Sequence, residues 1–249
     1  MTLVAPSPCS ATGPARVADR VCAVVVVVPA RDEAELVGRC LDALVAARAR
    51  LAVVRPEVVV RLVVACDACT DGTAEVARVR EDVAVVELDA RSVGVARAAG
   101  VALGRADLDG LDPAAVWLVC TDADSAVPEG WLVDQVRLAE EGADLVVGTV
   151  RPDGLTPSQA VRWARTHVPG RPNGHVHGAN LGVRLSVHDA VGGFAPVAEH
   201  EDVVLVDRAR DSGARLVASD VVEVLTSGRL VGRTPGGYAA HLAGSPWGA

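Results

Sequence analysis

The chain has 249 residues, of which 50% are hydrophobic, so it is long enough for one domain with a sizeable core or for two fused halves. Its formal net charge is −8, and arginine supplies all 24 basic side chains. The acidic balance argues against a nucleic-acid-binding protein, and the lack of lysine excludes a Walker-type phosphate loop and lysine Schiff-base chemistry.

The N-terminus and the apolar runs indicate the compartment. Residues 1–20 contain three prolines and a glycine but no basic start followed by an apolar segment, so they predict a flexible tail and not a signal peptide. The longest apolar run, Val21–Val28, is far shorter than the roughly 20 residues that cross a bilayer. Six cysteines in a chain of this length do not indicate a disulfide scaffold. We therefore expect a cytoplasmic protein without a transmembrane segment.

Strands and helices are predicted to alternate between residues 21 and 150. The continuous apolar run Cys22–Val28 indicates a strand that is buried on both faces. The strands expected next are Val58–Ala65, Val83–Leu88, Ala115–Cys120 and Asp144–Val150, and the helices are Glu33–Arg48, Thr73–Arg80, Val93–Leu103 and Glu129–Glu141. Such alternation predicts an α/β fold with a mostly parallel, Rossmann-like sheet and helices on both faces.

The pattern loosens after residue 150. Residues 151–180 hold four prolines and four glycines, which predict a long irregular connection. A helix is expected at Asp202–Ser212, and short strands are expected at Leu216–Val217 and Val221–Leu225. We therefore expect a regular half, residues 21–150, a smaller and less regular half, residues 151–240, and a C-terminal tail, residues 241–249.

Polar residues follow four consecutive predicted strands. They are Arg31–Glu33 after the first strand, Asp67 after the second, Asp89 and Arg91 after the third, and Thr121–Ser125 after the fourth. The carboxyl ends of parallel strands share one edge of the sheet, and ligands bind in the crevice outside that edge. The sequence therefore predicts a binding site lined by acids at this edge.

Asp122 and Asp124 are the most chemically specific members of this set. Side chains two residues apart on extended backbone point the same way, so the two carboxylates converge. A hard divalent cation such as Mg²⁺ would relieve their repulsion and share its oxygen ligands with substrate phosphates. The alternative is a pair of solvated loop acids. Asp107 and Asp109 have the same spacing but precede the fourth strand, at the opposite edge, so they serve as an internal comparison.

A second interpretation comes from Cys66 and Cys69, which form a C-x-x-C pattern where a strand meets a helix. A redox dithiol occupies such a junction, so a dithiol oxidoreductase is an alternative from a different reaction class. A dithiol site has no use for Asp122 and Asp124, and no second cysteine pair accompanies it for zinc. The other alternative is two small buried cysteines that flank Asp67.

The ordered set of motifs resembles the family 2 glycosyltransferases with the GT-A fold. The motifs are Val28–Glu33, Ala65–Thr73, Gly94–Arg97, Thr121–Ser125, Pro128–Leu132, His177–Gly182, Gly192–Phe194, Glu201–Asp202 and Thr226–Arg229. The resemblance spans about residues 22–240. It implies that residues 21–150 bind a nucleotide-diphosphate sugar, a UDP- or GDP-sugar, and that residues 151–240 form the acceptor-binding and catalytic half of the same domain.

The resemblance also implies roles on the donor side. The nucleotide sugar would be bound by Pro29, Arg31, Glu33, Asp67, Arg97, Asp122 and Arg229. Asp122 and Asp124 would hold Mn²⁺ or Mg²⁺ on the diphosphate, where the metal neutralises the leaving group. Arg229 would meet the diphosphate as a bidentate cation, the alternative being an exposed loop arginine.

On the acceptor side, the resemblance makes Asp202 the general base of an inverting transfer, taking the proton from the acceptor hydroxyl. The alternative for Glu201 and Asp202 is helix capping, and one acid can do both. The acceptor and sugar pocket would be formed by Trp131, His177, Gly178, Ala179, Asn180 and Glu201. His177 or His200 could complete the metal site.

Departures from the family pattern narrow the expectation. Cys66 stands where many members carry an aspartate, and Ala98 replaces a common asparagine. No transmembrane segment is predicted, which favours a single-transfer enzyme over a polymer-extruding synthase. A nucleotidyl- or sugar-phosphate-handling enzyme with the same acids is the nearest alternative. A dinucleotide-binding dehydrogenase is disfavoured because the first strand lacks a Gly-x-Gly-x-x-Gly motif.

Overall fold

The strands that the sequence predicts between residues 21 and 150 build one side of a single sheet. The computed structural model describes residues 20–165, 167, 175–232 and 238–243. Its strands lie in the order β3-β2-β1-β4-β6-β5-β7. Their bounds are β1 Ala23–Ala30, β2 Val59–Asp67, β3 Val83–Leu88, β4 Val116–Cys120, β5 Leu145–Asp153, β6 Leu181–Arg184 and β7 Leu216–Ser227.

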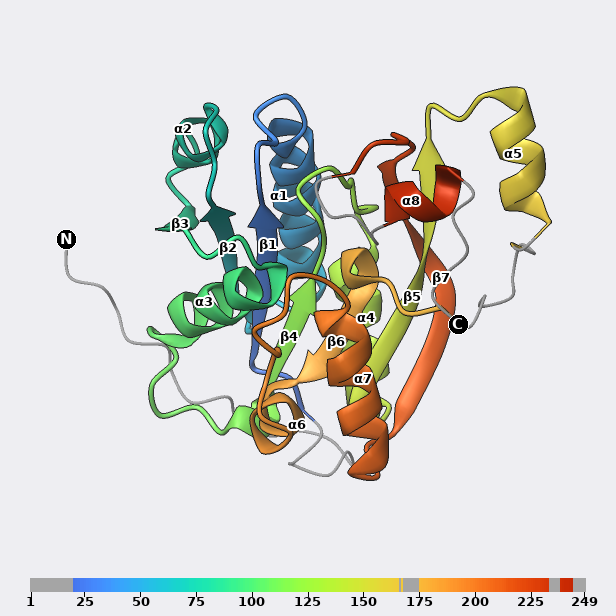
Figure 1. Cartoon of the computed structure of the whole chain (residues 1–249). Coiled ribbons are helices and arrows are strands. Elements are labelled where there is room, and N and C mark those ends of the chain that lie inside the picture. The colour runs from blue at the N-terminus through green and yellow to red at the C-terminus, as the bar shows by residue number, and fades with distance from the viewer. Residues whose placement is uncertain (1–19, 166, 168–174, 233–237, 244–249) are drawn as a thin grey trace.

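The sheet is mostly parallel, as predicted. The pairs β1–β2, β1–β4, β2–β3 and β5–β7 are parallel, and β6 lies antiparallel between β4 and β5. In Figure 1 the strands β1, β2 and β4 run toward the same end of the molecule. The loops that follow these three strands therefore meet at one edge of the sheet.

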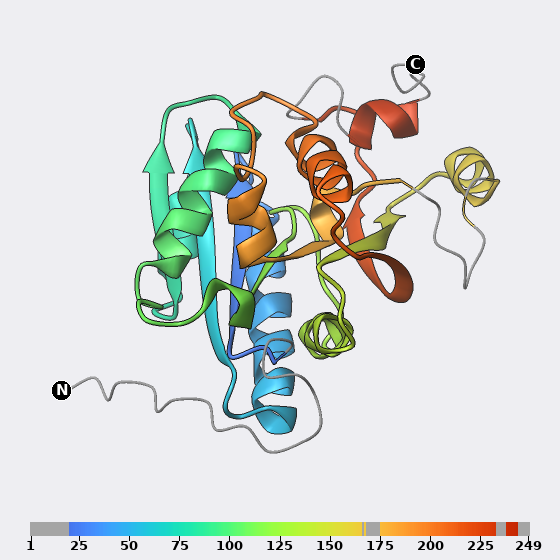
Figure 2. The same ribbon diagram turned by 90° about the horizontal axis from the view of Figure 1, so that it is seen from below.

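Helices cover both faces of the sheet, as Figure 2 shows along its edge. Their bounds are α1 Val37–Val54, α2 Thr73–Arg78, α3 Val93–Arg105, α4 Trp131–Glu140, α5 Pro157–Ala164, α6 Leu185–Ala190, α7 Glu201–Asp211 and α8 Tyr238–Ala243. Side chains of α1, α2 and α4 pack into the core on one face, and those of α3, α6 and α7 pack into the core on the other.

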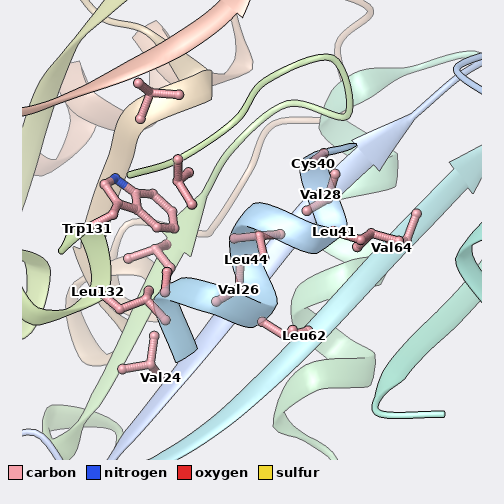
Figure 3. Close-up of a cluster of buried hydrophobic side chains, with 14 of the residues drawn as sticks. Val24, Val26, Val28, Cys40, Leu41, Leu44, Leu62, Val64, Trp131 and Leu132 are labelled. Carbon is pink, nitrogen blue, oxygen red and sulfur yellow. The ribbon is translucent and has the colours of Figure 1, made fainter. Parts of the chain in front are cut away.

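β1 shows why a continuous apolar run indicated a central strand. Val24, Val26 and Val28 face α1 and α4, where Figure 3 shows them beside Leu41 and Trp131. The alternate residues of the strand belong to the core on the opposite face. A strand that is buried on both faces has no need of polar residues, so its sequence loses the usual alternation.

Two glycines bring α3 close to β1. A Cβ atom at Gly100 would lie 2.5 Å from Cγ1 of Val27, and one at Gly104 would lie 2.5 Å from Cγ1 of Val25. Residues three and four apart share one face of a helix, so Arg97 lies on the same buried face as these glycines. The close approach of α3 therefore carries an arginine into the interior.

The structure corrects several sequence predictions after residue 150. The strands predicted at Leu216–Val217 and Val221–Leu225 are parts of one strand, β7. Its pairing with β5 shifts register between Gly148 and Val150, where β7 bulges. The helices α5, α6 and α8 and the antiparallel strand β6 were not predicted. The division into two halves at residue 150 stays a prediction.

The ends of the chain are described only in part. Most of the predicted N-terminal tail, residues 1–19, and residues 244–249 of the predicted C-terminal tail lie outside the described residues. Residues 241–243, which the tail prediction also included, belong to α8. In the part of the chain that the structure describes, no helix has the length and apolar character needed to span a membrane.

Candidate active site

The edge of the sheet predicted from the sequence opens into a cavity of about 280 Å³. Thirteen residues of the predicted site line it: Pro29, Arg31, Glu33, Asp67, Arg97, Asp122, Asp124, His177, Gly178, Ala179, Glu201, Asp202 and Arg229. They come from the ends of β1 and β2, from the loops after β1 and β4, from α3 and α7, and from the segments around η3 (Gly178–Asn180) and after β7. Segments that are far apart in the sequence therefore share one cavity.

Asp124 lies deep in this cavity, among both charged and hydroxyl groups. Its Oδ2 is 3.0 Å from Nη2 of Arg229, and its Oδ1 accepts hydrogen bonds from Ser125 Oγ at 3.3 Å and Thr226 Oγ1 at 3.4 Å. Burial and the charge of Asp122 raise the pKa of Asp124 to about 6. The site therefore favours added positive charge or a proton at this carboxylate.

Asp122 is the second member of the acidic pair. Its Oδ1 accepts a hydrogen bond from Nη2 of Arg97 at 2.8 Å. Burial raises the pKa of Asp122, the positive charge of Arg97 opposes the rise, and the charge of Asp202 adds to it. Arg97 Nη2, which binds Asp122, and Asp202 Oδ2 lie beside the same residue, Gly178.

Arg229 is a half-buried cation of the site. It donates a bidentate pair of hydrogen bonds to Glu33, with Nη1 2.9 Å from Oε2, and it also lies against Asp124. The predicted diphosphate cation thus neutralises two acids of the protein itself in this structure. The Glu33 carboxylate is buried by this contact, although the sequence analysis expected it to meet the nucleotide.

Asp67 is held by backbone groups instead of charges. Its Oδ1 accepts hydrogen bonds from the N–H groups of Ala90 at 2.7 Å and Arg91 at 2.9 Å, and its Oδ2 accepts one from Ser92 N–H at 2.6 Å. The carboxylate therefore fixes the loop between β3 and α3. Contact of Asp67 with the nucleotide stays a prediction, since Oδ2 keeps a further lone pair.

Asp202 occupies the first turn of α7 and faces the cavity. Its Oδ1 accepts the N–H of Val203 at 2.8 Å, which is the capping role considered in the sequence analysis. Its Oδ2 lies beside Gly178, where an added Cβ would be 3.2 Å away. His200, two residues before Asp202, has a φ of 62°, so the chain turns sharply where the helix begins. One oxygen thus orients the carboxylate while the other faces the cavity.

Trp131 and Asn180 do not belong to the cavity lining, contrary to the prediction that both form the acceptor pocket. Trp131 is fully buried, and its Nε1 donates to Oδ1 of Asn180 at 2.8 Å. The amide nitrogen of Asn180 donates to the carbonyl groups of Thr149 and Val222. Every polar group of the amide has a protein partner, so this pair stabilises the core beneath the cavity.

The structure gives no support to the dithiol interpretation. Cys66 and Cys69 are free thiols. Burial raises the pKa of Cys66 to about 12, and burial also raises the pKa of Cys69. A reactive dithiol needs a lowered thiol pKa, so the raised pKa of both cysteines argues against a redox site here. Neither belongs to the described lining of the cavity.

The residues that could hold a metal ion are the two acids after β4. Within the described residues, no group of three or more histidine, cysteine, aspartate and glutamate side chains is arranged to hold a metal. His177 packs edge-on against Tyr238, with ring centroids 5.6 Å apart. A metal at this site would therefore take its other ligands from the substrate and from water.

Comparison with known proteins identifies the chain. The model of Glycosyl transferase family 2 matches residues 25–197, more than half of the sequence. The chain belongs to glycosyl transferase family 2. This is the family that the ordered motifs had implied, and the acids that end or follow β1, β2 and β4 lie within the matched residues. A search of curated proteins gave no match.

Solved structures confirm the GT-A fold of this family 2 glycosyltransferase. It is similar to S. aureus TarS over 82% of this chain and 36% of that chain, with 14% identity and a TM-score of 0.59. Mannosyltransferase PcManGT from Pyrobaculum calidifontis, in complex with GDP-Man and Mn²⁺, is similar over 84% of this chain and 57% of its own, with 22% identity and a TM-score of 0.60.

A third similar structure is GalNAc-T7 with UDP, GalNAc and Mn²⁺. The similarity covers 86% of this chain and 46% of the GalNAc-T7 chain, with 14% identity and a TM-score of 0.60. This chain spans between 36% and 57% of the three solved chains. At these identities the likeness shows the shared fold alone.

Sequence reasoning gave no role to the hydroxyl groups beside Asp124. Ser125 Oγ donates to Thr226 Oγ1 at 2.9 Å, and both hydroxyls contact Asp124. Thr226 belongs to a motif that the sequence analysis listed, three residues before Arg229. In the sequence, the signal for a contact with the acidic pair was a hydroxyl residue three positions before Arg229, the candidate diphosphate cation.

Proposed function

We propose that this glycosyltransferase transfers a sugar from a UDP- or GDP-sugar to an acceptor hydroxyl with inversion at the anomeric carbon. Asp202 is the general base, and Asp122 and Asp124 hold Mn²⁺ or Mg²⁺. One observation carries the proposal: acids from the end of β4 and from the start of α7 line one cavity, where Arg97 binds Asp122 and lies with Asp202 Oδ2 beside Gly178.

The two acids after β4 fit a hard divalent cation. Both offer carboxylate oxygens, and the pKa of Asp124, raised to about 6, indicates unbalanced negative charge there. When bound, the cation would neutralise the diphosphate as it leaves. PcManGT and GalNAc-T7, which share the fold, were both solved with Mn²⁺. Metal binding is therefore the expected use of this pair.

Asp202 is suited to accept a proton. The Val203 N–H fixes its Oδ1, which leaves Oδ2 facing the cavity beside Gly178. In the transfer, the acceptor oxygen forms a bond to the anomeric carbon while its proton passes to Asp202 Oδ2. The bond from that carbon to the diphosphate breaks, and its electron pair leaves with the diphosphate. Proton removal of this kind is general base catalysis.

The donor side supplies binding groups for the nucleotide. Pro29 and Arg31 follow β1 and line the cavity, and Asp67 orders the loop that leads into α3. We propose that Arg229 weakens its ion pairs with Glu33 and Asp124 when the donor binds, and pairs with the diphosphate instead. The planar guanidinium matches the geometry of phosphate oxygens.

The test is thermal unfolding with UDP or GDP, with and without Mn²⁺. A nucleotide present at 100 times its Kd stabilises the folded protein by about 2.7 kcal/mol, which raises the Tm by about 5–10 °C. We expect this shift in the wild type and in Asp109→Ala, and we expect its loss in Asp124→Ala. Asp109 has the same sequence spacing but is exposed at the opposite edge, so it controls for the loss of one acid.

A nucleotide-induced shift that needs no Mn²⁺ and survives in Asp124→Ala would contradict the metal assignment. The nature of the released product separates the transferase from a nucleotidyl- or sugar-phosphate-handling enzyme with the same acids. A transferase releases nucleoside diphosphate from UDP-glucose or GDP-mannose, whereas release of sugar 1-phosphate would contradict the proposal.

A further inference from the structure

Arg97 connects three parts of the cavity wall. Its Nη2 donates to Asp122 Oδ1 at 2.8 Å, its Nε donates to Glu201 Oε1 at 2.7 Å, and its Nη1 donates to the carbonyl oxygen of Gly178 at 3.2 Å. These partners belong to the loop after β4, the first residue of α7 and the first residue of η3. One side chain thus spans from the donor acids to the helix that carries Asp202.

The burial of this contact sets it apart from a surface ion pair. The side chain of Arg97 is 2% exposed and that of Glu201 is 4% exposed. A guanidinium is a planar fork, so three acceptors around it fix its orientation, which a flexible ammonium group cannot reproduce. Removing one partner of a buried pair leaves the other charge uncompensated, so the arrangement has little freedom to relax.

We propose that Arg97 is a positioning residue of the transfer reaction: by holding Asp122 and Glu201 together, it sets the distance between the bound donor and Asp202. Glu201 directly precedes Asp202, so a shift of its carboxylate moves the first turn of α7 and the base with it. The inference rests on the proposed function, because it concerns the geometry between that donor and that base.

This role differs from the one that the family resemblance implied for Arg97. A direct contact with the nucleotide would contribute to donor binding, and its loss would raise the KM with little change in kcat. A positioning role predicts the opposite, because misplacement of reacting groups by about 1 Å costs about 100-fold in rate. The split between kcat and KM therefore separates the two interpretations.

Arg184 provides a matched control for the loss of a buried guanidinium. It is also buried, and its guanidinium donates to the carbonyl groups of Ala114 at 2.6 Å and Ala139 at 2.7 Å. It does not belong to the described lining of the cavity. The substitutions Arg97→Lys and Arg184→Lys remove the same fork from two buried sites, of which only one lies at the cavity.

The experiment measures the release of nucleoside diphosphate from UDP-glucose, UDP-N-acetylglucosamine and GDP-mannose with Mn²⁺, water being the acceptor, together with the Tm of each variant. We expect Arg97→Lys to lower kcat by about 100-fold with a donor KM within about threefold of the wild type. We expect Arg184→Lys to lower the Tm about as much as Arg97→Lys does, while its kcat stays within about threefold of the wild type.

A second variant keeps the test decisive if Arg97→Lys does not fold. Glu201→Gln preserves the shape of the side chain and an oxygen that accepts from Arg97 Nε, and it removes only the charge. We expect its kcat to fall by about 10-fold with UDP and GDP affinity unchanged.

Three results would overturn the positioning role: an unchanged kcat in both cavity variants, a KM effect alone, or an equal loss of kcat in Arg184→Lys. A wild-type enzyme that neither binds UDP or GDP with Mn²⁺ nor releases nucleoside diphosphate would instead overturn the proposed function itself.

Discussion

The two walls of the cavity hold their acids in different ways. After β1 and β2, Asp67 of the cavity wall and Asp32 and Asp71 in the adjoining loops accept hydrogen bonds from backbone N–H groups and threonine hydroxyls. On the wall between β4 and α7, Asp122 and Glu201 are paired with an arginine. Glu33 is the exception on the first wall, because it is paired with Arg229, which also contacts Asp124.

This difference separates the acids that fix loops in place from the acids that are available for ligand binding and catalysis. A carboxylate that accepts several N–H groups is stabilised locally, and it fixes the loops that donate to it. Carboxylates balanced by arginine keep a charge that a cationic or phosphate-bearing ligand can redistribute. We therefore expect the loss of an acid held by N–H groups on the first wall to lower stability, and the loss of an acid on the second wall to lower binding or rate without lowering stability.

The largest expected effect that tests this comparison concerns Asp202. Loss of a general base lowers the rate by about 10²–10⁴-fold, so Asp202→Asn should lower kcat by about 1,000-fold while UDP and GDP affinity stays unchanged. Nucleoside diphosphate release and calorimetric titration measure the two quantities. Asp207→Asn, on the same helix and 61% exposed, is the control. Unchanged turnover in Asp202→Asn would reduce this residue to a helix cap.

The next effect concerns the stability cost of the Asp124 charge. Its pKa of about 6 lies above the ordinary 3.8, so the folded state disfavours the ionised form at pH 7. Asp124→Asn should therefore increase the free energy of unfolding at pH 7 by about 2 kcal/mol, as measured by urea denaturation. Arg229 keeps its bidentate partner Glu33 in this variant.

The sign of the effect of Asp124→Asn follows from the way the free energy of unfolding depends on pH. Because the folded protein binds the proton more tightly than the unfolded chain, wild-type stability falls as the pH rises from 3.8 to about 6. The advantage of Asp124→Asn should vanish toward the lower end of that window. A destabilised variant at pH 7 would show that Asp124 belongs with the structural acids of the first wall.

The smallest effect is expected on the first wall, at Asp67. Asp67→Asn replaces one acceptor oxygen by an N–H₂ group that faces a backbone donor, which should cost at least about 1 kcal/mol of unfolding free energy in urea. Asp89→Asn lies in the same loop with its side chain 78% exposed, and it should change stability by less than about 0.5 kcal/mol. Equal stability of the two variants would remove the distinction between the walls.

The regular half of the fold was predictable because burial leaves a signal in the sequence. The boundaries of β3 were predicted as the structure has them, since Val83–Leu88 is bounded by polar residues on both sides. Strand β6 was missed because Leu181–Arg184 is four residues long, and it is a strand only through its pairing with β4 and β5. Such pairing is a tertiary effect that short segments do not encode locally.

The site was predictable to a similar degree. The carboxyl-edge rule brought Asp67, Asp122 and Asp124 to one cavity, where the structure has them. The burial of Trp131 was not predictable from its motif, because its partner Asn180 is distant in sequence and meets it only in the folded core. The contacts of Arg97 likewise depend on where α7 packs against α3.

Gly178 limits how this enzyme can change. A Cβ atom there would lie 2.4 Å from Nη2 of Arg97 and 3.2 Å from Oδ2 of Asp202. Any side chain at this position would push Arg97 and Asp202 apart. Under the proposed function, a substitution there would disturb the base, so a change of acceptor would have to arise elsewhere on the cavity wall, which includes the larger side chain of Tyr238.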